Sequence, residues 1–169
     1  MMKAKSLVLA LAGLAVSSAA AFAQTPTLIK QHKDWAAYTT PSGGGKVCYA
    51  LTKPTTMLPG DRNHGDVFFF VTSRPAENVA SEPSLVVGYP FKDKSSVSVD
   101  VDGKGFTLFT NNDGAWVENA ATEAQLVAAM KAGREMTVNG ESSRGTRTTY
   151  KFSLSGVTAA IDSAVSACR

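Results

Sequence analysis

Most of the chain alternates between apolar and polar residues with the period of two that is typical of β-strands. The clearest run is Ser96–Val101, in which valines fall on one face and serine and aspartate fall on the other. Segments rich in glycine, proline and asparagine separate the runs and mark turns. The run VFFFVT at 67–72 is apolar throughout, which predicts a strand buried on both faces. The expected strands are 34–38, 46–52, 67–72, 84–89, 96–101, 106–110 and 115–117.

Two later segments have the spacing of amphipathic helices. The first covers about 122–132, where Thr122 and Gln125 have the spacing of a capping box at the helix N-terminus. The second covers about 156–167 and brings Cys168 onto its apolar face. The apolar stripes are Leu126, Val127 and Met130 in the first helix and Val157, Ile161 and Val165 in the second.

The segment between the helices predicts a β-hairpin whose register can be derived. A three-residue loop at 143–145 puts Gly145 in the left-handed position that such loops require. Val138 then faces Tyr150, and the inner face is mostly apolar. A four-residue loop would place Val138 opposite Lys151, because a slip of one residue moves every side chain to the other face. The expected outer pairs are Thr137 with Lys151, Asn139 with Thr149 and Glu141 with Arg147.

Residues 1–23 have the features of a signal peptide. Lys3 and Lys5 precede an apolar run of about ten residues, Leu7–Val16, and Ala21–Ala23 has the A-x-A form of a cleavage site. The run is shorter than the roughly 20 residues needed to span a bilayer. We therefore expect cleavage near Ala23 and a mature chain without a transmembrane segment. The expected location is the periplasm, with outer-membrane association or secretion left open.

The remaining residues, 24–169, have the length of one domain. The strands and helices predict a mainly β fold, an antiparallel β-sandwich or barrel-like domain with two short α-helices. Loss of Lys3 and Lys5 lowers the formal charge from +3 to +1. A nearly neutral domain gives no electrostatic reason to expect nucleic acid or an anionic membrane as a partner.

The chain has two cysteines, Cys48 and Cys168, and export would place them in an oxidising compartment. Two free buried thiols and a redox pair are the alternatives to a structural bridge. A redox pair is expected close together as C-x-x-C, which this pair is not. We favour a structural disulfide. In the chain-entropy model, closing this loop would stabilise the fold by roughly 5 kcal/mol.

The sequence contains no recognisable catalytic motif or cofactor loop. It lacks G-x-S-x-G, H-E-x-x-H and a glycine-rich dinucleotide loop, and the glycines at 43–45 precede Lys46-Val47 rather than the Lys-Ser/Thr of a phosphate loop. Nothing in the spacing links His32 to His64, and we interpret His64 as a solvated loop residue. These absences predict a non-enzyme without metal or cofactor.

Two groups of residues are candidates for binding. The exposed cations of the predicted hairpin could grip a carboxylate or phosphate, although a solvated face with Arg147 paired to Glu141 explains them as well. Three aromatic residues could line a ligand groove, although such residues more often belong to a core. The candidates are Arg144, Arg147 and Lys151 among the cations and Trp35, Tyr89 and Trp116 among the aromatics.

Several motifs resemble the invasion-associated locus B family of Gram-negative bacteria. The resemblance is densest from Ala128 to Thr146, AAMKAGREMTVNGESSRGT, and continues through Ser153-Leu154 to Cys168. Asp34-Trp35 and Cys48-Tyr49 are similar to the N-terminal signature of that family. The resemblance implies an exported, mostly β protein, associated in some members with host-cell invasion, and it implies no enzymatic activity.

The resulting hypothesis is an exported, non-catalytic envelope protein that acts through its surface on an unknown protein or envelope partner. The alternative is a periplasmic small-ligand or glycan-binding protein with an aromatic-lined groove. An apolar concavity around the three aromatics would favour the ligand, whereas exposed apolar patches on a flat surface would favour a protein partner.

Overall fold

The computed structural model of the chain describes residues 25–169, so the expected signal peptide at 1–23 lies outside the described part. Within residues 25–169, eleven strands form one antiparallel sheet in the order β1-β2-β3-β5-β6-β9-β8-β7-β10-β11-β4. The strands are β1 (Thr27–His32), β2 (Trp35–Ser42), β3 (Gly45–Thr52), β4 (Thr56–Leu58), β5 (Phe68–Arg74), β6 (Val79–Val86), β7 (Ser96–Val101), β8 (Lys104–Asn111), β9 (Gly114–Trp116), β10 (Glu135–Glu141) and β11 (Arg147–Ser153). The helices are the 3-10 helix η1 (Pro75–Glu77), α1 (Ala120–Ala132) and α2 (Val157–Ala167).

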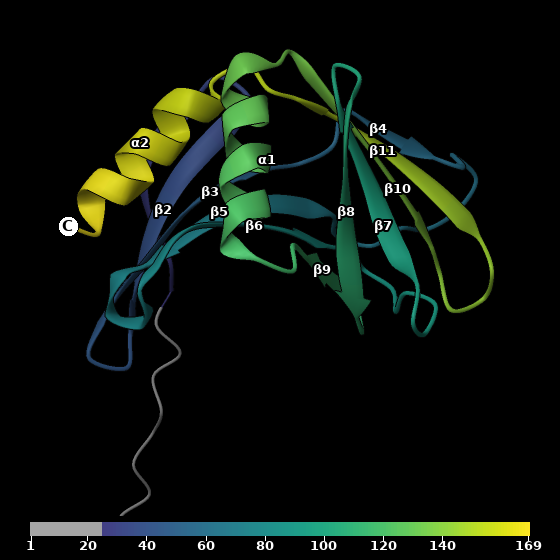
Figure 1. Cartoon of the computed structure of the whole chain (residues 1–169), viewed down its shortest axis with the longest axis horizontal. Helices are drawn as coiled ribbons and strands as arrows, with labels where there is room; N and C mark the ends of the chain where they lie inside the picture. Colours follow the sequence, from purple (N-terminus) through teal and green to yellow (C-terminus); the bar gives the residue numbers. More distant parts are fainter. Residues whose placement is uncertain (1–24) are drawn as a thin grey trace, which may run out of the picture.

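The sheet curls until its two halves face each other. Figure 1 shows the strands as the two arms of an arch, with β2, β3, β5 and β6 in one arm, β4, β7, β8, β10 and β11 in the other, and α1 between them. Across the interior, the rings of Phe69 on β5 and Phe152 on β11 lie 5.7 Å apart, although these strands are not neighbours in the sheet. Trp35 Nε1 on β2 donates to the carbonyl oxygen of Ser153 on β11 at 2.9 Å. A mainly antiparallel, barrel-like sheet with two α-helices confirms the fold class expected from the sequence.

The core follows the alternation along the strands. Ser96–Val101 forms β7 as predicted, and its valines are buried while the residues between them are exposed. The strand near 67–72 is not buried on both faces, which corrects the prediction. Phe69 and Val71 of β5 are buried, whereas Phe68 and Phe70 are partly exposed on the opposite, outer face. The outer face of β5 carries apolar residues, although α2 covers only the inner face of the sheet.

The missed or shifted strands have physical explanations. The sheet ends at β1 and β4, whose residues are mostly exposed and therefore show no amphipathic pattern. The expected strand at 84–89 is instead β6, which starts at Val79 and ends at Val86. The chain then leaves the sheet, because the backbone at Gly88 packs directly against Gly65 and Gly88 N donates to His64 O at 3.0 Å.

The first helix begins earlier than the sequence pattern indicated. Asn119 is the N-cap of α1, and its Oδ1 accepts hydrogen bonds from the backbone N and the hydroxyl of Thr122, both at 3.0 Å. Thr122 is therefore not the cap, and the predicted capping box with Gln125 is wrong. Asn119 replaces it because its amide oxygen satisfies the same free N–H groups. The predicted apolar stripe of Leu126, Val127 and Met130 is buried.

The predicted hairpin register is confirmed. Val138 pairs with Tyr150, and Met136 pairs with Phe152. Gly145 has the required positive φ of 82° in the three-residue loop. The hairpin ends lead into α2, where Val157 and Ile161 are buried against the sheet.

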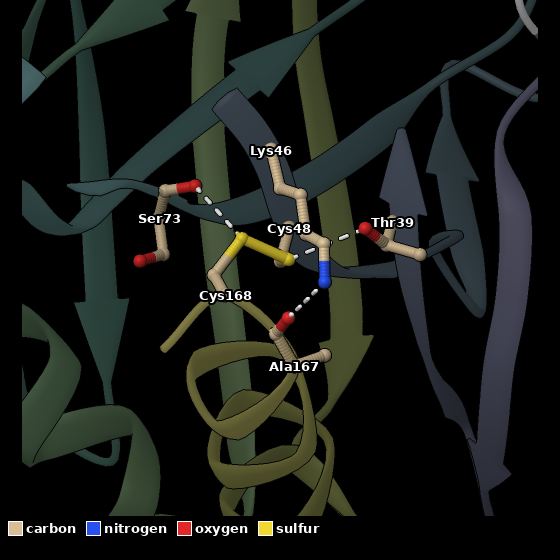
Figure 2. Close-up of a disulfide and its surroundings, with 6 residues drawn as sticks. All are labelled: Thr39, Lys46, Cys48, Ser73, Ala167 and Cys168. Atoms are coloured by element: carbon tan, nitrogen blue, oxygen red, sulfur yellow. Dashed lines mark hydrogen bonds between the residues drawn. A yellow bond between two sulfur atoms is a disulfide. The ribbon is translucent and has the colours of Figure 1, made fainter. Parts of the chain in front are cut away.

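Cys48 on β3 and Cys168 after α2 form a disulfide that joins residues 120 positions apart. Figure 2 shows the bridge between the end of α2 and the inner face of the sheet, with Cys168 Sγ near the carbonyl oxygen of Ser73 at 4.0 Å. Ala37 and Ala164 complete a small buried cluster around the two cysteines. Small side chains at these positions let the helix lie close to the strands, so the bridge holds α2 on the sheet.

We predict that Gly156→Ala lowers the free energy of unfolding by about 2 kcal/mol or more. Gly156 is the N-cap of α2 with φ +94°, and a Cβ there would collide with the carbonyl oxygen of His32. Urea denaturation gives the difference. Gly103→Ala is the matched control, because Gly103 has φ +92° and no atom within 4 Å of an added Cβ. Equal losses at the two positions would show that the close approach to His32 contributes nothing.

We predict that replacing both bridged cysteines by alanine lowers the free energy of unfolding by about 3–5 kcal/mol, since the bridge constrains the unfolded chain. Urea titrations with and without dithiothreitol measure this effect. The reductant should weaken the wild type to the level of the double variant and leave the variant unchanged. Thiol titration of the denatured, unreduced protein supplies the check, and two reactive thiols per chain would contradict the Cys48–Cys168 pairing.

Candidate functional site

The three aromatic candidates lie in different environments. Trp35 is fully buried in the core. Trp116 lies on the outer face of β9, where its ring centroid is 6.1 Å from that of Phe109 on the paired strand β8. Tyr89 is half-buried after β6 and points its hydroxyl at Tyr150. The structure does not bring these residues together, so no groove is formed by the three of them.

The three basic candidates also separate. Lys151 Nζ lies 3.1 Å from Glu135 Oε1 in an exposed ion pair. Glu141 Oε1 lies 3.0 Å from Lys92 Nζ, so the ion pair expected between Glu141 and Arg147 is replaced by one to Lys92, although the two residues face each other in the register. Lys92 follows an isolated bridge between Phe91 and the hairpin, which places its amine beside Glu141. Arg144 lies at the hairpin tip.

The outer face of the sheet carries aromatic side chains on β2, β3, β5, β9 and β8, which we call the outer aromatic strip. Ring centroids of neighbouring members lie 5.6 Å apart for Tyr38 and Tyr49, 5.7 Å for Tyr49 and Phe70, and 5.8 Å for Phe70 and Phe68. Ser84 lies between Phe70 and Trp116 in the strand pairing, which continues the row to Phe109. The strip consists of Tyr38, Tyr49, Phe68, Phe70, Trp116 and Phe109.

The strip is open to solvent, because α2 packs on the opposite face of the same strands. Cys48 and Ala50 of β3 turn toward the helix side, whereas Tyr49 between them turns outward. Phe109 is 48% exposed, and the other members are partly exposed. Burial among its neighbours raises the pKa of the Tyr49 hydroxyl, and Tyr38 raises it further. An exposed apolar surface of this kind is typical of an interaction site.

The charged groups that border the strip are paired with each other. Lys53 Nζ lies 4.9 Å from the Phe68 ring centroid and 3.4 Å from Asp66 Oδ1. On β5 and β6, Arg74 donates to both carboxylate oxygens of Glu82, at 3.2 and 2.9 Å. The strip therefore presents aromatic surface with little net charge, which suits an apolar protein surface better than an ionic one.

A second feature is a concave one. A cavity of about 640 Å³, which we call the hairpin-tip pocket, lies between the loop 61–64, the segment 88–90 and the hairpin tip 142–148. Arg62 and Arg144 contribute the cations of its lining, and Asp61 contributes the carboxylate. Of the predicted candidates, Arg144 and Tyr89 meet in this pocket.

The floor of the pocket is a buried chain of hydrogen bonds. His64 is 5% exposed, so its interpretation as a solvated loop residue is wrong. Its Nδ1 lies 2.9 Å from Tyr150 Oη, and its Nε2 lies 2.9 Å from the carbonyl oxygen of Pro59. Tyr89 Oη lies 2.8 Å from Tyr150 Oη and 2.7 Å from Thr148 Oγ1. The sequence could not reveal this contact, because His64 and Tyr150 are 86 positions apart.

The donors in this chain can be assigned from the carbonyl at its end. A carbonyl only accepts, so Nε2 of His64 carries a proton and, in the neutral ring, Nδ1 accepts from Tyr150. Tyr150 Oη then accepts from Tyr89. Burial raises the pKa of both tyrosine hydroxyls, so both stay neutral. Both ring nitrogens of His64 are occupied, which makes the residue an anchor for its loop.

The described part of the chain lacks two kinds of feature. Within residues 25–169, no group of three or more histidine, cysteine, aspartate or glutamate side chains could hold a metal ion. No helix among these residues is long and apolar enough to cross a membrane.

The comparisons with known proteins give one family and one similar fold. Residues 35–165 match the family model described as "Invasion associated locus B (IalB) protein". The crystal structure of invasion associated protein b from Bartonella henselae is similar in fold, with a TM-score of 0.61 and 15% sequence identity over 82% of this chain and 95% of that chain. No curated protein matches the chain. Since the family model covers most of the sequence, this chain belongs to the invasion-associated locus B family.

Proposed function

We propose that this chain is an exported, non-catalytic protein that binds an envelope or host protein through the outer aromatic strip. Its layout is a signal peptide at 1–23 and one invasion-associated locus B domain at 24–169. The Cys48–Cys168 bridge and the family membership support a location outside the cytoplasm, and we assign the mature protein to the periplasm or the cell surface. The name of the Bartonella henselae neighbour supports a role linked to invasion.

The observation that carries this proposal is the exposed aromatic surface itself. Aromatic side chains are enriched where proteins bind each other, and a small number of them carry most of the binding energy. The strip extends over β2, β3, β5, β9 and β8, with Ser84 of β6 in the row. Because the sheet fixes the strand backbones, the rings are already arranged for a partner and lose little conformational entropy on binding.

A non-catalytic role is supported by the state of the available chemical groups. His64 is bonded at both ring nitrogens, and His32 Nε2 lies 2.8 Å from Ser163 Oγ on α2. His64 therefore has no free ring nitrogen for general base catalysis, and within residues 25–169 no carboxylate is hydrogen-bonded to His32 to orient it toward Ser163 as the third member of a triad would.

The second candidate, a small-ligand or glycan binder, does not gain support from the aromatic trio of Trp35, Tyr89 and Trp116, which are apart. A concave site does exist at the hairpin tip, and it is independent of the outer aromatic strip, because it lies between loops at another part of the sheet.

We predict that Phe109→Ser weakens binding of the envelope or host partner at least tenfold, because the variant removes the most exposed ring of the strip. The oxidised protein is used to capture a partner from cell-envelope and host-membrane fractions. The captured protein is then purified, and its dissociation constants for the wild type and the variants are measured by titration calorimetry.

Met57→Ser is the matched control, since Met57 is 42% exposed but lies on β4 at the far edge of the sheet. It should bind like the wild type. Equal affinity of Phe109→Ser and the wild type, or an equal loss in Met57→Ser, would exclude the strip as the binding surface. If no protein is enriched from either fraction, the proposed interaction role is contradicted.

A further inference from the structure

We propose that the hairpin-tip pocket binds a small sugar-like ligand that carries an oxyanion, either a carboxylate or a phosphate. The pocket is separate from the outer aromatic strip, because the two are formed by different residues. The volume of the pocket, about 640 Å³, lies within the range of small-molecule sites.

The charge of the pocket favours an anion. Arg62 and Arg144 reach the same cavity from two different loops, while Asp61 is the carboxylate in the lining. Arg62 approaches Asp61 only at 3.9 Å, and within residues 25–169 Arg144 makes no salt bridge. Two guanidinium groups with unused donors form the planar forks that match carboxylate and phosphate oxygens.

The rest of the lining favours hydroxyl groups on the ligand. Ser143 and Thr146 place hydroxyls at the cavity, and Asn63 adds an amide. Asn63 Oδ1 already accepts from Gly65 N at 2.9 Å, which leaves the amide hydrogens as donors. Hydroxyls that both donate and accept suit a polyol, whose own hydroxyls do the same.

The walls of the pocket are bonded to one another before any ligand arrives. Gly88 N donates to His64 O at 3.0 Å, and Ser143 N donates to Pro90 O at 2.9 Å. A Cβ at Gly88 would lie 2.5 Å from Gly65 Cα, so the two backbones are in direct contact. Because the three segments are already fixed, binding needs little ordering of loops, which favours affinity for a small ligand.

The neighbouring hollow gives a contrast on the same hairpin. Arg147 lines it together with Lys92 and Lys94, but Asp93 and Glu141 lie in the same lining, and Glu141 is paired with Lys92. One of its cations is therefore held by a carboxylate at 3.0 Å, whereas the ion pair in the lining of the hairpin-tip pocket, Arg62 with Asp61, is 3.9 Å apart. Arg147 thus serves as a guanidinium of similar exposure and sequence context outside the proposed site.

The test is titration calorimetry of the oxidised protein with four probes: glucuronate, glucose 6-phosphate, glucose and inorganic phosphate. We expect binding of glucuronate or glucose 6-phosphate, and the one that binds more tightly identifies the oxyanion. Glucose and inorganic phosphate should each bind at least tenfold more weakly than the better anionic sugar. Arg62→Gln and Arg144→Gln should each weaken that sugar about tenfold, in line with a lost charge-assisted hydrogen bond.

The matched control is Arg147→Gln, which removes the same charge from the same hairpin and should leave the affinity within twofold of the wild type. Amide chemical shifts should move at residues 61–64 and 142–146 on addition of the sugar. The proposal is overturned if neither anionic sugar binds at a concentration of about 10 mM, which is high enough to detect a weak site. It is equally overturned if glucose or inorganic phosphate binds as tightly as the better anionic sugar. It is also overturned if the three arginine variants lose affinity equally.

Discussion

The structure depends on the closure of the sheet at the corner formed by Asp34 and Trp35. Trp35 fills the centre of the core and donates to the carbonyl oxygen of Ser153, which links the second strand to the penultimate element of the chain. Asp34 adds a backbone bond to Ser155 and accepts from the Ser153 hydroxyl at 2.6 Å. These bonds join the two arms of the sheet beside the core contact between Phe69 and Phe152.

Closure assigns different tasks to the two faces of the sheet. The inner face must be apolar, because it packs against the opposite arm and the two helices. The outer face packs against neither the opposite arm nor a helix, so the fold does not explain its aromatic residues on β2, β3 and β5. A single soluble domain would be better served by polar residues there, which is why the strip supports an interaction rather than stability.

Local patterns could be predicted from the sequence where one interaction dominates. The hairpin register followed from one glycine and one alternating pattern, and the pairing of Val138 with Tyr150 is as expected. Long-range consequences could not be predicted. The burial of His64 depends on Tyr150, which lies far along the chain. Both Asn119 and Thr122 could cap α1, and only the structure shows that Asn119 does so. The partly exposed Phe68 and Phe70 are the residue type expected in a strand buried on both faces, so the sequence of β5 could not show that one of its faces is open.

The disulfide would have a consequence for the order of events during the proposed export. Cys168 follows every strand of the sheet, whereas Cys48 lies in the third strand. A chain that crosses a membrane from its N-terminus therefore exposes Cys48 to the oxidising side long before its partner. During that interval Cys48 is an unprotected thiol, open to pairing with other thiols outside the cell's reducing interior. Under the proposed export, the correct bridge could therefore form only after every strand of the sheet had emerged.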